Sequence, residues 1–214
     1  MAKGNKLKLS FYPASAARWH DLEELFGERG ACGGCWCMFW RLPRKEFDAG
    51  KGAGNKRALK RIVTTGREPG IIGYLNHEPI AWCAMAPRAD YSALERSRIL
   101  KPVDDEPVWS VSCLFIKKPY RRQGVSAQSL RAAVAFAASH GATIVEGYPV
   151  EPSVNTPDPF LWHGVASAFL AAGFKEVARR SNSRPIMRYE INDAAPATRQ
   201  RRQVRSKPPS KATI

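Results

Sequence analysis

One stretch of the chain, residues 108–126, restricts most strongly what this sequence can fold into. It reads VWSVSCLFIKKPYRRQGVS, and its first nine residues are apolar apart from two serines. Such a run is typical of a strand that is buried on both faces of a sheet. Pro119 ends the strand because proline cannot donate a hydrogen bond to a sheet ladder. A basic turn follows, and a helix is predicted to begin directly after it.

The turn between this strand and the helix predicts an anion site. Arg121 and Arg122 supply positive charge, and Gly124 lets a ligand approach the backbone closely. The N–H groups at the start of the following helix attract anions. We therefore expect a phosphorylated ligand to bind here; the alternative is a solvated basic turn.

Hydrophobic periodicity predicts further strands and helices around this unit. The predicted strands cover residues 6–13, 70–75, 79–86, 142–150, 174–179 and 185–191, and the predicted helices cover residues 15–26, 55–63, 126–139 and 160–172. Residues 47–55 are expected to form a glycine-rich loop. The strands before and after the helix of residues 126–139 should be parallel. The sequence therefore predicts a mixed α/β fold.

Charge divides the chain into a single domain over residues 1–193 and a basic tail over residues 194–214. The net charge is +15, and the tail contributes six basic residues and no acidic one. We predict a disordered tail; the alternative is nucleic-acid binding without sequence preference. No apolar run approaches the ~18 residues of a membrane-spanning helix, and the N-terminus lacks the pattern of a signal peptide. We expect a cytoplasmic protein with no membrane partner.

Residues 30–43, GACGGCWCMFWRLP, combine three cysteines with large aromatic side chains. Cys32, Cys35 and Cys37 could ligate zinc only with a fourth ligand from another part of the chain, and no second pair of ligands follows at a finger-like spacing. We predict no metal, and we interpret the segment as an aromatic, thiol-lined wall over a pocket or as part of the core.

The order of elements over residues 7–191 resembles that of the GNAT acetyltransferase superfamily. The most specific motif is Arg121-x-x-Gly124-x-Ser126, which is similar to the family's Gln/Arg-x-x-Gly-x-Gly/Ala loop. The run from Ala171 to Phe174 resembles the end of the family's last helix. The resemblance implies a mixed central sheet of about six or seven strands, flanked by helices, in which the parallel strand pair splays apart.

The resemblance also implies acetyl-coenzyme A as the acetyl donor. The end of the central strand would pair with the pantetheine arm as an added strand does, and the basic loop would hold the pyrophosphate. The cofactor-binding residues would be Leu114, Phe115 and Ile116 in the strand, and Arg121, Arg122, Gln123, Gly124, Val125 and Ser126 in the loop.

The implied function is N-acetylation of a small molecule or peptide by direct attack of its amine on the thioester, with the help of a base and an acid. The sequence departs from the family's pattern, because Phe169 stands where the family often has a tyrosine and Trp162 where it often has an asparagine. The remaining catalytic candidates are Tyr148 as the acid, Glu146 as the base, and His163.

By the same resemblance, residues 32–40 would form one wall of the acceptor site, with Cys35, Trp36, Phe39 and Trp40 as the substrate-binding residues. Aromatic rings stack on aromatic or cationic groups, which favours a small or partly apolar amine. Two alternatives stay open. One is a catalytically silent sensor that binds acyl-coenzyme A, and the other is an RNA- or ribosome-associated protein that binds through the basic tail. A homodimer also remains open.

Overall fold

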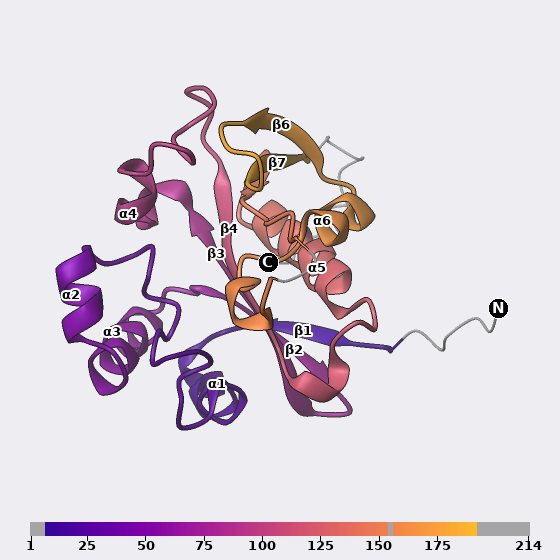
Figure 1. Cartoon of the computed structure of the whole chain (residues 1–214). Helices are drawn as coiled ribbons and strands as arrows, with labels where there is room; N and C mark the ends of the chain where they lie inside the picture. The colour runs from indigo at the N-terminus through magenta and orange to yellow at the C-terminus, as the bar shows by residue number, and fades with distance from the viewer. Residues whose placement is uncertain (1–6, 154–155, 192–214) are drawn as a thin grey trace, which may run out of the picture.

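The computed structural model describes residues 7–153 and 156–191 and shows one twisted sheet with helices on both of its faces (Figure 1). The described strands are β1 (Ser10–Pro13), β2 (Gly70–Leu75), β3 (Glu78–Pro87), β4 (Trp109–Ile116), β5 (Ile144–Gly147), β6 (Lys175–Arg179) and β7 (Pro185–Glu190). The described α-helices are α1 (Trp19–Phe26), α2 (Arg44–Ala49), α3 (Ala53–Thr64), α4 (Ser92–Glu95), α5 (Val125–Ser139) and α6 (Ala166–Ala172).

The strands lie in the order β1-β2-β3-β4-β5-β7-β6, which makes a sheet of seven strands within the described ranges. Neighbouring strands are antiparallel, except for β4 and β5, which are parallel and are connected through α5. The predicted fold class, a mixed sheet flanked by helices with one parallel pair, is therefore confirmed.

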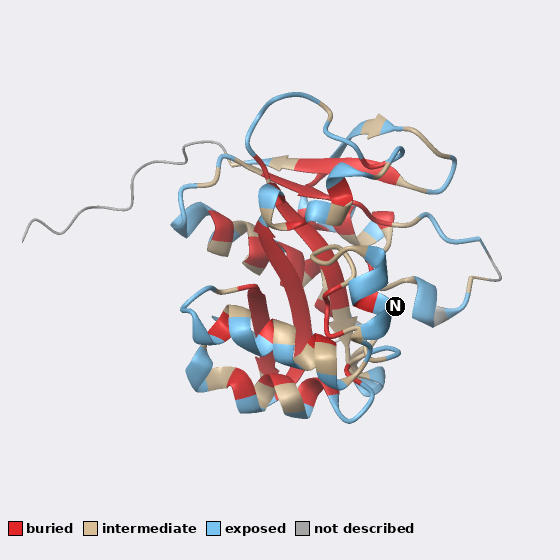
Figure 2. Cartoon of the chain, turned by 90° about the vertical axis from the view of Figure 1, so that its left-hand side faces the viewer, coloured by how far each residue is buried: buried red, intermediate tan, exposed pale blue. Residues whose placement is uncertain are grey.

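The centre of the sheet is buried on both faces (Figure 2). On β3, Trp82 and Ala84 face a core formed with α1 and α3, whereas Cys83 and Met85 face a core formed with α5 and α6. A strand that alternates between two cores must be apolar at successive positions. This requirement explains why the strands at the centre of the sheet lack the polar and apolar alternation of a half-exposed strand.

Besides the shorter strands found within residues 6–13 and 142–150, the structure differs from the predicted elements at two places. Residues 47–49 belong to α2 and not to a loop, because Phe47 buries its ring in the core. The helix predicted over residues 160–172 begins only at Ala166, because the residues before it form a turn closed by the N–H of Gly164 and the carbonyl of Leu161, and then bond to neighbouring backbone. The second difference shapes the site described below.

The parallel pair of β4 and β5 separates at a β-bulge. Ala84 lies opposite Cys113 and Met85 lies opposite Val111, so Ser112 is an extra residue on β4. The pairing between β4 and β5 ends at the same level, where Val111 lies opposite Gly147. A bulge bends its strand and increases the local twist. β4 therefore leaves β5 at this point, which confirms the splayed parallel pair expected from the resemblance.

Two expectations concern partners of the chain: that it has no membrane partner, and that its basic tail could bind nucleic acid. None of the helices in the described ranges has both the length and the apolar character to cross a membrane. The basic tail, residues 194–214, lies outside the described residues, so its predicted disorder and nucleic-acid binding stay predictions.

Gly147, the last paired residue of β5, offers a test of the packing at the point of separation. A methyl group at position 147 would overlap the ring of Phe169 on α6, which is fully buried and has no room to move aside. We expect Gly147→Ala to lower the free energy of unfolding by about 1–3 kcal/mol, as measured by urea denaturation. Gly54→Ala is the control, because a methyl group there meets open space within α3 and should stabilise the helix. Equal stabilities of the two variants would contradict this packing.

Candidate active site

The opening between β4 and β5 is partly filled by the segment that leads into α6. On the β4 side, the carbonyl of Trp162 accepts the N–H of Leu114 at 2.6 Å. On the β5 side, the N–H of Val150 donates to the carbonyl of Gly164 at 2.9 Å, and the N–H of Ala166 donates to the carbonyl of Val150 at 3.0 Å. The inserted segment thus supplies hydrogen-bond partners to both edges of the opening, where buried backbone groups would otherwise lack them.

Gly164 is required for this insertion. Its φ angle of +81° lies in the left-handed region, and a Cβ atom there would come within 2.7 Å of the side chain of Leu114. A residue with a side chain would therefore push the inserted segment away from β4.

The end of β4 presents backbone groups to the opening, as the pantetheine prediction requires. The N–H of Lys117 donates to Ile80 of β3 at 2.9 Å. Alternate residues of an antiparallel strand point to opposite sides, so Leu114 and Ile116 direct their N–H and carbonyl groups away from β3. All three predicted strand residues lie opposite β3, but the backbone groups of Phe115 point toward β3. Trp162 takes the N–H of Leu114 and Arg121 the carbonyl of Ile116, so the carbonyl of Leu114 and the N–H of Ile116 are the groups of this edge that suit an added strand.

The loop after β4 has the backbone of an anion site. Arg122 and Gly124 have left-handed φ angles of 59° and 75°, and Gly124 is the N-cap of α5. The carbonyl of Gly124 already accepts the N–H of Gln128 at 3.2 Å. The N–H groups of the first turn of α5, which precede Gln128, are those that a helix leaves without intrahelical partners. N–H groups in this position attract anions.

Side chains tie this loop to the end of β4. The Nε–H of Arg121 donates to the carbonyl of Ile116 at 3.0 Å, and the side-chain amide of Gln123 donates to the carbonyl of Pro119 at 2.7 Å. Val125 is buried and anchors the start of α5, whereas Arg122, Gln123 and Gly124 are exposed. The structure thus brings the predicted donor residues together into one surface that runs from the strand end to the helix start.

The predicted acceptor wall divides into two parts. Trp36 is buried, with 3% of its surface exposed, and it stacks on Trp19 of α1 with 6.0 Å between ring centroids. Its indole covers Gly30, where a Cβ atom would overlap the ring. Cys35 is half-buried against the same core. These two predicted substrate-binding residues therefore lie beneath the wall and not at the opening.

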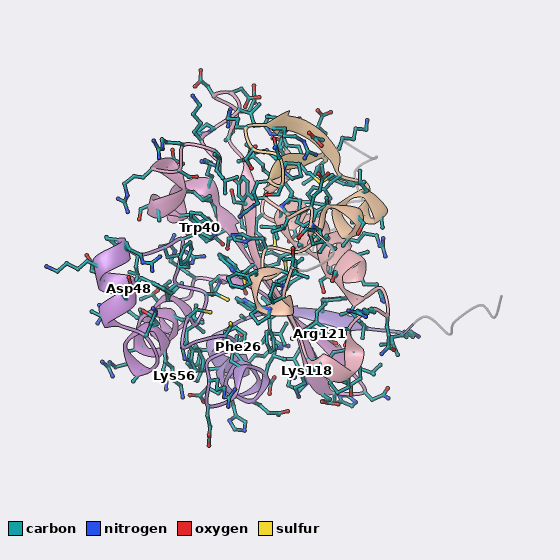
Figure 3. The ribbon with its side chains drawn as sticks, in the orientation of Figure 1. Phe26, Trp40, Asp48, Lys56, Lys118 and Arg121 are labelled. Carbon is teal, nitrogen blue, oxygen red and sulfur yellow. The ribbon has the colours of Figure 1, made fainter. Side chains whose placement is uncertain are left out.

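Phe39 and Trp40 form the other part and reach the inserted segment. The ring of Phe39 packs edge-on against Trp40 and Trp162 at centroid distances of 4.8 and 5.3 Å. Trp40 also lies 5.8 Å from the ring of His163. In Figure 3, Trp40 lies between α2 and α4, and Arg121 lies at the start of α5, with the segment that leads into α6 between them in this view. The aromatic cluster and the basic loop thus flank one opening.

His163 is held by this aromatic cluster. The Nε1–H of Trp40 donates to Nε2 of His163 at 3.2 Å, and 5% of the histidine surface is exposed. Burial, together with the charge of Arg184, lowers the pKa of His163 well below its ordinary value. The ring is therefore neutral, and because Nε2 accepts a hydrogen bond, the proton lies on Nδ1.

Glu146 and Tyr148 belong to a buried polar network at the end of β5. The Glu146 carboxylate, fully buried, accepts hydrogen bonds from Arg188 Nε at 2.7 Å and from the Tyr148 hydroxyl at 2.7 Å, and it pairs with Arg88 at 3.3 Å. The Tyr148 hydroxyl also accepts a hydrogen bond from Arg88 at 2.6 Å and contacts Ser110 at 2.8 Å. The polar atoms of both predicted catalytic residues are thus occupied within the protein.

Burial and the charge of Glu146 raise the pKa of Tyr148. The two arginines continue the network outward, because Arg88 also bonds Glu95 at 2.8 Å and Arg188 forms a bidentate pair with Asp104 at 2.6 and 2.8 Å. This arrangement satisfies a buried carboxylate in the way that structural ion pairs do.

Comparison with known proteins identifies the fold and the family. The sequence model of the Acetyltransferase (GNAT) family matches residues 36–158. The chain belongs to this family. A GNAT-family acetyltransferase from Listeria monocytogenes 4b F2365 has a similar structure, with a TM-score of 0.52 at 9% sequence identity over 89% of this chain and 98% of that chain. Another from Streptococcus agalactiae 2603 gives a TM-score of 0.51 at 12% identity over 86% and 98%. No curated protein matches the sequence.

Membership of the GNAT family confirms the reaction class predicted from the sequence, which is acetyl transfer. Within this GNAT chain, the structure brings His163 together with Phe39 and Trp40, although more than a hundred residues separate them. Sequence reasoning missed two residues in the surroundings of His163. Trp162 was noted only as a departure from the family's pattern, and Arg184 carries no motif or periodicity that would single it out.

The cysteines of the GNAT chain are free thiols. A hydrogen bond with Cys37, followed by burial, raises the pKa of Cys35, and a hydrogen bond with Cys113 is the largest cause of the raised pKa of Cys37. Both thiols are therefore protonated in the fold as described. The described ranges contain no group of three or more histidine, cysteine, aspartate or glutamate side chains that could hold a metal ion.

The paired arginines predict a large effect of removing the charge of Glu146. We expect Glu146→Gln to lower the free energy of unfolding by about 3–5 kcal/mol, because Arg88 and Arg188 would lose their shared buried anion. Glu176→Gln, which breaks an exposed ion pair with Arg179, is the matched control and should have a much smaller effect because solvent screens that pair. Thermal and urea denaturation would measure both. Similar losses in the two variants would show that the network is not the stabilising feature inferred here.

Proposed function

We propose that this GNAT-family acetyltransferase is an N-acetyltransferase that transfers the acetyl group of acetyl-coenzyme A to an amine of a small molecule or peptide. One observation carries the proposal. The opening between β4 and β5 has a basic helix-start loop on one side and an aromatic cluster on the other. A donor with a diphosphate and a separate acceptor can thus meet at the same backbone edge.

The donor has a position on this surface that matches its chemistry. The pyrophosphate of acetyl-coenzyme A lies at the first turn of α5, where N–H groups and the charges of Arg121 and Arg122 favour an anion. The amides of the pantetheine arm pair with the carbonyl of Leu114 and the N–H of Ile116, which the strand directs to the opening. The N–H of Leu114 keeps its bond to Trp162.

The reaction is a direct transfer. The neutral amine of the acceptor attacks the thioester carbonyl carbon, a C–N bond forms, and the C–S bond breaks. The amine gives up its proton to water, and the coenzyme thiolate takes up a proton. No cofactor beyond the acetyl donor is needed.

The three predicted catalytic residues take different parts in this proposal. His163 lies in the opening among the aromatic rings and contacts the acceptor substrate. Tyr148 and Glu146 hold the end of β5 through the buried network, and so keep the opening in its shape. Trp36 and Cys35 support Phe39 and Trp40 from the core side.

Turnover of acetyl-coenzyme A tests the proposal. The full chain is incubated with acetyl-coenzyme A and with amino acids, polyamines, aminoglycosides and peptides with free N-termini. We expect release of the coenzyme thiol that depends on one class of amine, together with a product that has gained one acetyl group by mass spectrometry. Tight binding of acetyl-coenzyme A without turnover across the panel would contradict the proposal and favour the alternative of a silent sensor.

The basic loop gives a second prediction. We expect Arg121→Ala combined with Arg122→Ala to weaken acetyl-coenzyme A binding about 10- to 100-fold, because two charge-assisted contacts to phosphate are lost. Isothermal titration calorimetry measures the affinity at fixed salt. Arg122→Ala alone should account for part of the loss, and since Arg122 is exposed, this variant leaves the bond between Arg121 and Ile116 intact.

The matched control removes the same charge elsewhere. Arg57→Ala combined with Arg61→Ala lowers the net charge equally on the exposed face of α3, and it should leave the affinity within about twofold. An equal loss in both double variants would mean that general electrostatic attraction, and not the loop, binds the donor.

A further inference from the structure

Arg184 is a partly buried cation that has no carboxylate partner within residues 7–153 and 156–191. It lies directly before β7, and its Nη2 donates to the carbonyl of Tyr148 at 3.0 Å. Its Nε is buried and has no hydrogen-bond partner among the described residues. Burial lowers the pKa of Arg184, which is the direction for a cation that has lost water and gained no anion.

The neighbouring arginines show that Arg184 is an exception. Arg188 pairs with Glu146 and Asp104, and Arg88 pairs with Glu146 and Glu95. A charge withdrawn from water is normally paired, because otherwise nothing offsets the lost hydration. The carboxylate of Glu146 is already occupied by two arginines. The described part of the chain therefore supplies no anion to Arg184.

His163 contributes a second group without a partner. Its Nε2 accepts the hydrogen bond of Trp40, so the neutral ring carries its proton on Nδ1. This Nδ1 is buried and has no partner among the described residues. A buried donor without an acceptor is costly and uncommon in native proteins. The ring therefore presents an N–H that is suited to an acceptor atom from outside the chain.

The guanidinium of Arg184 and the ring of His163 belong to the same site. The charge of Arg184 acts on the ring of His163. Arg184 bonds the carbonyl of the residue that follows β5, and His163 lies in the segment inserted beside that strand. A carboxylate is an acceptor of several hydrogen bonds and carries one negative charge. It would satisfy a guanidinium and an imidazole N–H together.

We propose that the acceptor substrate carries a carboxylate next to its amine, as an amino acid does, and that Arg184 and the Nδ1–H of His163 bind this carboxylate. The inference rests on the proposed N-acetyltransferase function and narrows its substrate class. The rings of Trp40 and Trp162 lie beside His163, and Phe39 packs against both of them, so this cluster contacts the apolar part of the substrate.

Matched substrates test the inference. Each common amino acid is compared with its C-terminal amide, which keeps the amine and the side chain but lacks the negative charge. For the amino acid that reacts best, we expect kcat/KM to exceed that of the amide about 10- to 100-fold. Equal or greater activity with the amide would overturn the inference.

Variants of Arg184 locate the effect. Arg184→Met should remove the preference by lowering kcat/KM for the amino acid about 10- to 100-fold while changing that for the amide less than about threefold. Arg184→Lys should retain part of the preference because it keeps the charge. Arg180→Met is the matched control, since the guanidinium of Arg180 bonds only the carbonyls of Lys101 and Pro102 among the described residues. A preference that survives Arg184→Met would overturn the inference.

A binding measurement separates this inference from the proposed function. Isothermal titration calorimetry with the N-acetyl amino acids and their amides needs no turnover. Acetylation of amines without a carboxylate preference leaves the function standing and overturns the inference. Binding of N-acetyl amino acids that depends on Arg184, in a chain that acetylates no amine, supports the carboxylate site and overturns the function. Absence of both binding and preference overturns the inference.

Discussion

The opening between β4 and β5 can exist only because the backbone groups along both of its edges have partners. A sheet that separates in its interior exposes two rows of N–H and carbonyl groups, and burying them without hydrogen bonds would be costly. The bulge at Ser112 turns β4 away, and the segment that ends in α6 then enters the gap and bonds Leu114 on one side and Val150 on the other. The remaining edge of β4 stays open beside the basic loop. The donor surface is therefore a consequence of how the gap is filled.

The same inserted segment also forms part of the proposed acceptor site. It places Trp162 and His163 against Phe39 and Trp40, which come from a segment far away in the sequence. Two charge systems then meet at the end of β5. One is closed, because Glu146 lies between two arginines. The other is incomplete, because among the residues that the structure describes Arg184 bonds only a backbone carbonyl. A buried ion pair with all its charges matched is costly to break, whereas an unmatched charge is suited to a ligand.

The sequence allowed the order of the elements, the buried central strand and the basic loop to be predicted, because these depend on local patterns of apolar residues, glycine and proline. It did not reveal that α6 begins at Ala166, since the hydrogen bonds that hold the preceding residues in place come from β4 and from Val150. The acidic residue in a buried strand, Glu146, was singled out correctly as unusual. Its two arginines lie 58 and 42 residues away, and no local pattern shows such pairs.

The backbone of residues 30–37 explains why neighbouring aromatic residues have opposite environments. Trp36 and Cys37 have left-handed φ angles of 43° and 51°, which are uncommon for residues with side chains and persist only where packing holds them. That turn buries Trp36 against α1 and leaves Phe39 and Trp40 to face the inserted segment. The shape of the proposed acceptor wall is therefore set from behind by the core. An aromatic wall beside an incomplete charge favours a substrate that is apolar at one end and anionic at the other.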